Sequence, residues 1–164
     1  MNEKLQILFV CLGNICRSPT AEAVFQQKIE CNGLIEQIEI DSAGTAAWHS
    51  GKSPDSRSIL AGKKRGYELS SLRARQVMEE DFFRFDYILA MDEANLEALK
   101  DMRPKNAKAN PELFLAYCEN SPFLEVPDPY YGGDDGFNTV LDLIENASDA
   151  LLNTLEKRGQ ISWQ

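Results

Sequence analysis

The chain begins with an apolar run, LQILFV, which leads directly into the turn CLGNICRSP. A lysine precedes the run and a turn follows it, as is typical of a buried strand. Beyond the turn, Ser18 suits the N-cap of a helix and Pro19 suits its first turn. The pattern therefore predicts a strand, a tight turn and a helix, which is the unit from which parallel sheets are built.

Strands and helices alternate along the rest of the chain. We expect further strands at 38–44 and 85–91 and helices at 19–30, 53–67, 92–102 and 140–158, with a helical turn at 79–85. The second helix should start near Ser53 or Asp55 and end near Gly66. Segment 111–118 fits a strand or a helix equally well. This alternation predicts an α/β fold, a doubly wound parallel sheet with helices on both faces, in one domain over residues 1–164.

The composition excludes several classes of protein. The formal net charge of −9 argues against nucleic acid or an anionic membrane surface as a partner. No apolar run approaches the roughly 20 residues of a membrane-spanning helix, and the short N-terminal run lacks the cleavage site of a secretory signal. The four cysteines are too sparse for a disulfide framework. We therefore expect a cytoplasmic protein with reduced thiols and no membrane insertion.

The turn after the first strand is suited to bind an anion. The first amides of a helix lack backbone partners and, together with the helix dipole, favour an oxyanion such as phosphate. Gly13 and Asn14 tolerate left-handed backbone conformations, so the turn can close into a cup. Arg17 adds a planar guanidinium that can hold two phosphate oxygens.

Cys11 lies at the base of this cup, at the end of the strand. The amides, the dipole and Arg17 should favour its thiolate at neutral pH, and Ser18 can donate its hydroxyl to the sulfur. A cysteine at a strand end is otherwise most often a small buried apolar residue. Because this one lies between a strand and a helix start, with an arginine six residues on, we interpret it as a nucleophile beneath a bound phosphorus atom.

Ligands of parallel α/β folds bind beyond the carboxyl ends of the strands. The turn at Cys11 follows the first strand, and segments 41–45 and 91–95 end the second and third. A loop rich in proline and glycine follows late in the chain, at 126–137. We expect these segments to converge on one crevice.

Cleavage of a phosphate ester without a metal needs a side chain that protonates the departing oxygen. Asp128 lies between Pro127 and Pro129, and an aspartate that faces a thiolate and a phosphate dianion keeps its proton more readily than usual. His49, the only histidine, is the other candidate. Asp-Pro is more often a solvated turn, but with the cup at Cys11 in the same chain we favour Asp128 as the acid.

Five segments carry a family resemblance. VCLGNICRSP, DSAGT, WHSGKSPDSR, MDEAN and DPYYGGDDGF closely resemble the motifs of low-molecular-weight protein tyrosine phosphatases, from the first strand to the final helix. The resemblance implies a four-stranded parallel sheet of flavodoxin-like architecture. It also implies that Cys11 is the nucleophile, Arg17 the phosphate clamp and Asp128 the general acid and base. Such a hydrolase cleaves phosphotyrosine and aryl phosphates through a phosphocysteine, with no cofactor and no metal.

The resemblance also assigns the residues around the reacting atoms. The substrate-binding positions are Leu12, Gly13, Asn14, Ile15, Cys16, Ser18, Trp48, Tyr130 and Tyr131. The aromatic side chains among them form a slot that suits phosphotyrosine. Relatives that act on phosphoarginine carry threonine at the position of Ile15, whereas isoleucine fits an aromatic ring. We therefore expect phosphotyrosine as the substrate and keep phosphoarginine as an alternative.

Ser42 and Asp92 are expected to support the turn. By resemblance, Asn14 and Ser42 hydrogen-bond to brace it, and ordinary turn contacts are the alternative. Asp92 either orients the turn or caps its own helix, and capping is the more common role. By resemblance, Cys16 forms a reversible disulfide with Cys11 under oxidation, and a quiet packing thiol is the alternative.

Two functions of other classes remain open from the sequence. An arsenate reductase uses the same scaffold but relays electrons through further cysteines, typically near the end of the third strand, where YILAMDEANLEAL has none. A phosphoprotein-binding module or a flavodoxin-like carrier would need neither the thiol nor the acid. We therefore expect a phosphatase that acts on tyrosine-phosphorylated proteins or small aryl phosphates, as a monomer or with weak self-association.

Overall fold

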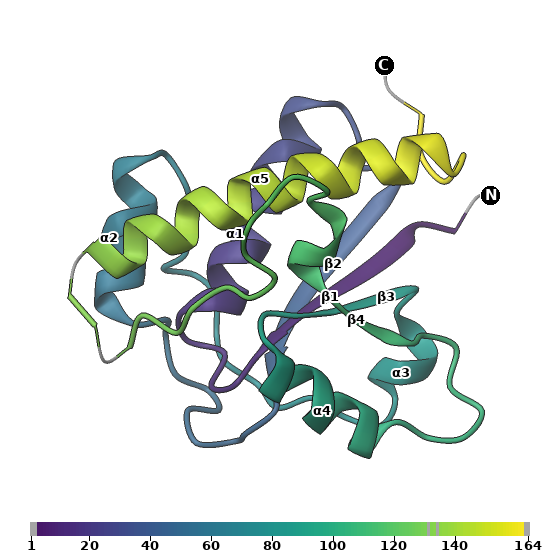
Figure 1. Cartoon of the computed structure of the whole chain (residues 1–164), viewed down its shortest axis with the longest axis horizontal. Coiled ribbons are helices and arrows are strands. Elements are labelled where there is room, and N and C mark those ends of the chain that lie inside the picture. The colour runs from purple at the N-terminus through teal and green to yellow at the C-terminus, as the bar shows by residue number, and fades with distance from the viewer. Residues whose placement is uncertain (1–2, 131, 134, 163–164) are drawn as a thin grey trace.

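In the computed structural model, which describes residues 3–130, 132–133 and 135–162, four parallel strands form one sheet. The strands are β1 (Leu5–Cys11), β2 (Ile38–Gly44), β3 (Tyr87–Ala90) and β4 (Pro111–Leu113). Their order is β2-β1-β3-β4, so β1 lies between the second and third strands (Figure 1). The predicted α/β fold of flavodoxin-like architecture is confirmed. In such sheets, ligands bind where the strand order changes direction.

Helices cover both faces of the sheet. They are α1 (Arg17–Cys31), α2 (Ser56–Lys64), α3 (Asp81–Arg84), α4 (Glu93–Met102) and α5 (Asp135–Lys157), with a 3-10 turn, η1, at Phe114–Tyr117. α1 and α5 pack together on one face, with α2 beside α5, and α3 and α4 lie on the other face (Figure 1). None of the helices described is long and apolar enough to cross a membrane.

The central strand sends its side chains alternately into two apolar cores. Ile7 and Phe9 of β1 face the core shared with α1 and α5. Leu8 and Val10 face the core shared with α3 and α4. Because the strand is enclosed on both faces, its buried residues 7–10 are all apolar. The end of β1, where Cys11 lies, is therefore held from both sides.

Several element boundaries differ from the predicted ones. Segment 111–118 divides into the short strand β4, which pairs with β3, and the turn η1. α5 begins at Asp135, five residues earlier than the first apolar position that predicted it, residue 140. α2 begins at Ser56 because the carboxylate of Asp55 accepts a hydrogen bond from the Arg57 amide and caps the helix.

The start of α1 differs from the prediction in a way that concerns the site. The helix begins at Arg17, with Cys16 in the cap position and no side chain of the described residues capping it. Ser18 lies inside the first turn, so its predicted role as the N-cap is wrong. Its hydroxyl lies 3.0 Å from the sulfur of Cys11 instead. The first amides of α1 are therefore left for another partner.

Candidate active site

The turn between β1 and α1, residues 11–17, closes around the sulfur of Cys11. The Asn14 amide donates to Cys11 Sγ at 3.3 Å, and the Ser18 hydroxyl lies 3.0 Å from the same atom. Asn14 has a φ of 56°, the left-handed conformation expected in this turn. Both contacts can stabilise a negative charge on the sulfur.

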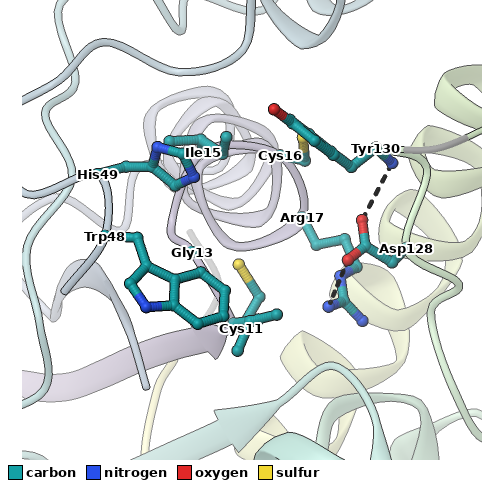
Figure 2. Close-up of a pocket in the computed structure, with 10 residues that line it drawn as sticks. Cys11, Gly13, Ile15, Cys16, Arg17, Trp48, His49, Asp128 and Tyr130 are labelled. Atoms are coloured by element: carbon teal, nitrogen blue, oxygen red, sulfur yellow. Dashed lines mark hydrogen bonds and ion pairs between the residues drawn. The ribbon is translucent and has the colours of Figure 1, made fainter. Parts of the chain in front are cut away.

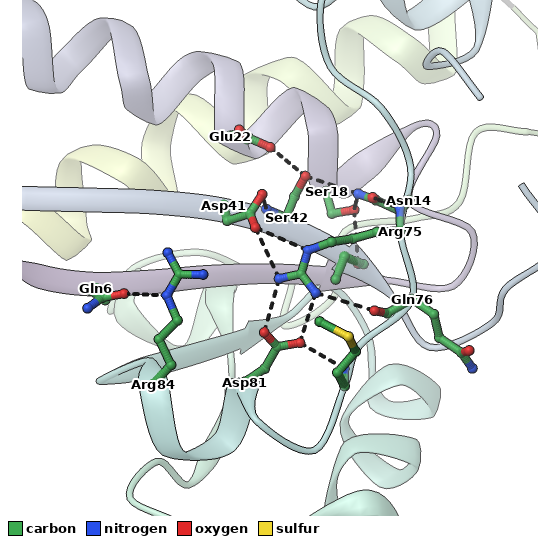
Figure 3. Close-up of polar contacts among 12 residues, drawn as sticks. Gln6, Asn14, Ser18, Glu22, Asp41, Ser42, Arg75, Gln76, Asp81 and Arg84 are labelled. Carbon is green, nitrogen blue, oxygen red and sulfur yellow. Dashed lines mark hydrogen bonds and ion pairs between the residues drawn. The ribbon is translucent and has the colours of Figure 1, made fainter. Parts of the chain in front are cut away.

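Asn14 and Ser42 brace this turn from behind (Figure 3). The side-chain amide of Asn14 donates to Ser18 Oγ at 2.7 Å and to Ser42 Oγ at 3.0 Å. Its side-chain carbonyl accepts from the Arg75 amide at 3.0 Å. The predicted bracing contact is confirmed. The side chains of Asn14 and Ser18, which were expected to bind substrate, are not among those that line the cavity described below.

The end of β2 packs directly against the backbone of the same turn. A Cβ atom at Gly44 would lie 2.7 Å from the Leu12 carbonyl oxygen, closer than a side chain allows. The following amide, of Thr45, donates to the Cys11 carbonyl at 2.9 Å. Because only glycine permits this approach, the glycine of the DSAGT segment ties the turn to the sheet.

The guanidinium of Arg17 lies buried between two carboxylates. Nη1 donates to Asp92 Oδ2 at 2.5 Å and to the Val126 carbonyl at 3.0 Å. Nη2 lies 3.5 Å from Asp128 Oδ2. Burial alone would lower the pKa of Arg17, but the facing Cys11 sulfur and the two carboxylates raise it above its ordinary value. The cavity therefore contains a permanent positive charge.

Asp92 makes the contacts that both roles left open by the sequence require. Its Oδ1 accepts from the Asn95 amide at 2.8 Å, and the Asn95 side chain accepts from the Asp92 amide at 3.2 Å. These reciprocal bonds form a capping box at the start of α4. The other carboxylate oxygen binds Arg17. The residue therefore caps its helix and orients the guanidinium at once.

Asp128 projects toward the cavity from the loop that precedes α5. Its Oδ1 accepts from the Tyr130 amide at 3.0 Å, and its Oδ2 faces Arg17 (Figure 2). The side chain is 37% exposed, so water and a substrate oxygen can reach it. Asp128 and Cys11 line the same cavity, which is the arrangement that a proton donor and a nucleophile require.

The predicted catalytic side chains meet in a cavity of about 250 Å³. Its lining consists of Cys11, Leu12, Gly13, Ile15, Cys16, Arg17, Trp48, His49, Asp128 and Tyr130. Trp48 and Tyr130 are 71% and 37% exposed, so the aromatic side chains lie at its mouth (Figure 2). The turn after β1 and the loop at 126–137 meet at this cavity. Segments 41–45 and 91–95, which were expected to join them there, contribute no lining residue and contact the turn through Gly44 and Asp92. Tyr131, the remaining predicted binding residue, lies outside the described residues.

Two residues at the cavity were not among the predicted site residues: His49, which the sequence offered only as the alternative acid, and Arg57. His49 lines the wall beside Gly13, where an added Cβ atom would lie 3.0 Å from His49 Cδ2. Arg57 donates to the Tyr130 carbonyl at 3.0 Å. Both belong to the segment WHSGKSPDSR, one of the five that carry the family resemblance. Their position in this segment was the sequence signal that could have assigned them to the site. The contacts themselves were not predictable, because they join residues far apart in the chain.

Cys16 lies at the cavity as a buried thiol. Burial raises its pKa to about 12, and nearby Asp55 acts in the same direction. Burial therefore disfavours the thiolate form of Cys16. In the described part of the chain, no three His, Cys, Asp or Glu side chains gather in a way that could hold a metal ion.

Comparison with known proteins leads to the same family as the motifs. The low molecular weight phosphotyrosine protein phosphatase family matches residues 6–161. The low molecular weight phosphotyrosine protein phosphatase of Schizosaccharomyces pombe is 48% identical over 138 residues, which cover 84% of this chain and 88% of that protein. The crystal structure of a protein tyrosine phosphatase from Entamoeba histolytica superimposes with a TM-score of 0.90 at 45% identity, covering 95% of this chain and 99% of that one.

A more distant neighbour is a Drosophila arginine phosphatase, with a TM-score of 0.87 at 30% identity over 93% of this chain and 98% of that one. The family match extends over all four strands and over the turn, the guanidinium and the carboxyl group that meet in the cavity. The chain therefore belongs to the low molecular weight phosphotyrosine protein phosphatase family.

Proposed function

We propose that this chain hydrolyses phosphotyrosine and other aryl phosphates through a phosphocysteine at Cys11. The observation that carries the proposal is a single cavity in which the Cys11 sulfur, the Arg17 guanidinium and the Asp128 carboxyl group meet beside the uncapped start of α1. A nucleophile, an anion site and a proton donor therefore face the same bound group.

In the first step, Cys11 Sγ attacks phosphorus. A sulfur–phosphorus bond forms while the bond between phosphorus and the phenolic oxygen breaks. The amides of residues 11–17, which we call the phosphate-binding turn, and the Arg17 guanidinium hold the other phosphate oxygens. Asp128 gives its proton to the departing oxygen, so the leaving group departs as a neutral phenol.

In the second step, Asp128 is a carboxylate and takes a proton from a water molecule that attacks the phosphocysteine. The sulfur–phosphorus bond breaks, inorganic phosphate leaves and Cys11 returns as a thiolate. The Ser18 hydroxyl, 3.0 Å from the sulfur, can donate to it as the negative charge returns. These two reaction steps need no cofactor, because each proton and each electron pair has a donor and an acceptor among these groups and water.

The walls of the cavity favour an aromatic leaving group. Trp48 and Tyr130 at the mouth and Ile15 in the lining offer an apolar surface to a phenol ring. Phosphoarginine, which carries a charged guanidinium next to the phosphate, suits this surface less well. An arsenate reductase would need a further reactive thiol, but the segment that follows the third strand contains no cysteine, and burial disfavours the thiolate of Cys16, the second cysteine at the cavity.

The natural substrates on this proposal are tyrosine-phosphorylated proteins or small aryl phosphates. The chain would act on them as a monomer or with weak self-association. Because the reaction requires a reduced Cys11, a cytoplasmic setting suits it.

Cys11→Ser and Asp128→Asn test the proposal with phosphotyrosine as the substrate. Cys11→Ser should lower kcat/KM about 1,000-fold or more, because a serine hydroxyl is a far weaker nucleophile than a thiolate. Asp128→Asn should lower it about 100-fold, because the phenolate must then leave without a proton. Phosphoarginine serves as the comparison substrate and should be turned over more slowly by the parent. Turnover that survives in Cys11→Ser would overturn the proposal.

A further inference from the structure

Arg57 connects the start of α2 to the loop that carries Asp128. Its Nη2 donates to the Tyr130 carbonyl at 3.0 Å. Its guanidinium carbon lies 5.5 Å from the centre of the Tyr130 ring and 4.8 Å from the centre of the Phe137 ring. The guanidinium therefore contacts this part of the chain through one hydrogen bond and two aromatic faces.

The backbone of Tyr130 links Arg57 to Asp128. The carbonyl of Tyr130 accepts from Arg57, and its amide donates to Asp128 Oδ1 at 3.0 Å (Figure 2). The other oxygen of Asp128 lies 3.5 Å from Arg17, which is a looser contact. A shift of the Tyr130 backbone would therefore move the shorter of the two contacts that orient the carboxyl group.

Arg57 is held in turn by Asp55. Its Nε and Nη2 donate to the two oxygens of Asp55, each at 3.0 Å, and the Asp55 side chain is only 10% exposed. The Asp55 amide donates to the carbonyl of Ile15, in the phosphate-binding turn, at 2.8 Å. A continuous set of contacts therefore runs from the turn that holds Cys11, through α2, to the loop that holds Asp128.

We propose that Arg57 is a positioning residue that fixes the acid loop, residues 126–130, relative to the phosphate-binding turn. The inference rests on the proposed function, in which Asp128 is the general acid. Arg57 is not among the residues that line the cavity, so it acts through Tyr130 and not on the substrate. Its loss should impair protonation of the leaving group more than binding of the phosphate or attack by Cys11.

The dependence of the rate on the leaving group isolates proton donation. p-Nitrophenolate leaves readily without a proton, whereas the far more basic phenolate, whose conjugate acid has a pKa of about 10, needs one. In Arg57→Ala, kcat/KM should fall about tenfold on phenyl phosphate and only about twofold on p-nitrophenyl phosphate. Arg57→Lys should show most of this loss, because an ammonium cannot bind both Asp55 oxygens and the Tyr130 carbonyl in one plane.

Arg65→Ala is the matched control. Arg65 also joins α2 to α5, through Asp142 at 2.9 Å and Glu145 at 2.7 Å, but it does not line the cavity. This variant should leave the ratio of the two kcat/KM values unchanged. Because both values come from one preparation, their ratio does not depend on how much of a variant is folded.

Asp128→Asn separates failure of this inference from failure of the proposed function. If Asp128→Asn loses no more activity on phenyl phosphate than on p-nitrophenyl phosphate, Asp128 is not the acid and the proposed function fails. If Asp128→Asn shows the greater loss on phenyl phosphate but Arg57→Ala keeps the parent's ratio, the positioning role is wrong. Once Asp128→Asn is present, Arg57→Ala should add little further loss on phenyl phosphate, and full additivity would also overturn the inference.

Discussion

Asp92 divides its two carboxylate oxygens between a helix and a guanidinium. One oxygen caps α4 through the Asn95 amide, and the other binds Arg17 at 2.5 Å. A helix cap needs only an oxygen acceptor, whereas a guanidinium is held best by a full negative charge. The two contributions can therefore be separated by substitution at this one residue.

Asp92→Asn and Asp92→Ala should both lower kcat/KM on p-nitrophenyl phosphate about tenfold, because Arg17 loses the charged partner that orients it. Only Asp92→Ala also removes the cap, so its free energy of unfolding should lie about 1 kcal/mol below that of Asp92→Asn. Steady-state kinetics and urea unfolding measure the two effects. Parent-like kinetics in Asp92→Asn would show that Asp92 serves the helix alone.

At the scale of elements, Glu22 places a carboxyl group of α1 against β2 (Figure 3). Its Oε1 accepts from the Ser42 hydroxyl at 2.6 Å. Burial raises the pKa of Glu22 to about 7, and Asp41 acts in the same direction, while the Ser42 bond and Arg75 oppose the shift. Because Ser42 also accepts from Asn14, this contact joins the helix to the phosphate-binding turn.

The raised pKa of Glu22 predicts that stability depends on pH. The folded chain binds this proton more tightly than the unfolded chain, where the pKa is near 4.5, so the stabilisation is present at low pH and is lost as the pH rises through about 7. Glu22→Gln cannot ionise, and its free energy of unfolding should rise relative to the parent by about 2 kcal/mol between pH 5 and pH 8. Urea unfolding at both pH values measures the difference. Glu30→Gln, at an exposed position of α1, is the control and should show no such rise.

At the scale of the whole molecule, the strand order brings distant segments to one end of the sheet. β1 lies between β2 and β3, so the turn after β1 opens beside the segments that follow its two neighbours. The bonds of Arg17 to Asp92 and to Val126 span 75 and 109 residues of the chain. An anion bound at this turn would therefore stabilise the folded state as a whole, and not a single helix.

Inorganic phosphate, the product of the proposed reaction, should raise the melting temperature. At a hundredfold excess over its Kd, a ligand that binds only the folded state adds about 2.7 kcal/mol, which corresponds to about 5–10 °C for a domain of this size. Cys11→Ser should keep this shift, because the amides and the guanidinium remain, whereas Arg17→Ala should lose it. Scanning calorimetry, with chloride at matched ionic strength as the control, measures the shift. An equal shift in Arg17→Ala would contradict the anion site.

The parts of this protein that could be predicted are those encoded locally. A buried strand, a glycine-bearing turn and a helix start follow one another over a few residues, so Cys11 and Arg17 could be placed on one turn from the sequence alone. The alternation of strands and helices was enough for the fold class. The boundary within 111–118 was not predictable, because the short strand there is defined by its pairing with β3 and not by its own periodicity.

Only the tertiary structure decided what surrounds these groups. The carboxylate of Asp92 binds Arg17 while capping α4, His49 lines the wall, and Arg57 reaches the acid loop. Hydrogen bonds and ring contacts between distant residues depend on how the elements are placed relative to one another, and local propensity does not encode that placement. The sequence by itself thus indicated which residues would carry the chemistry, while the strand order of the open sheet and the placement of its loops decided which neighbours contact them.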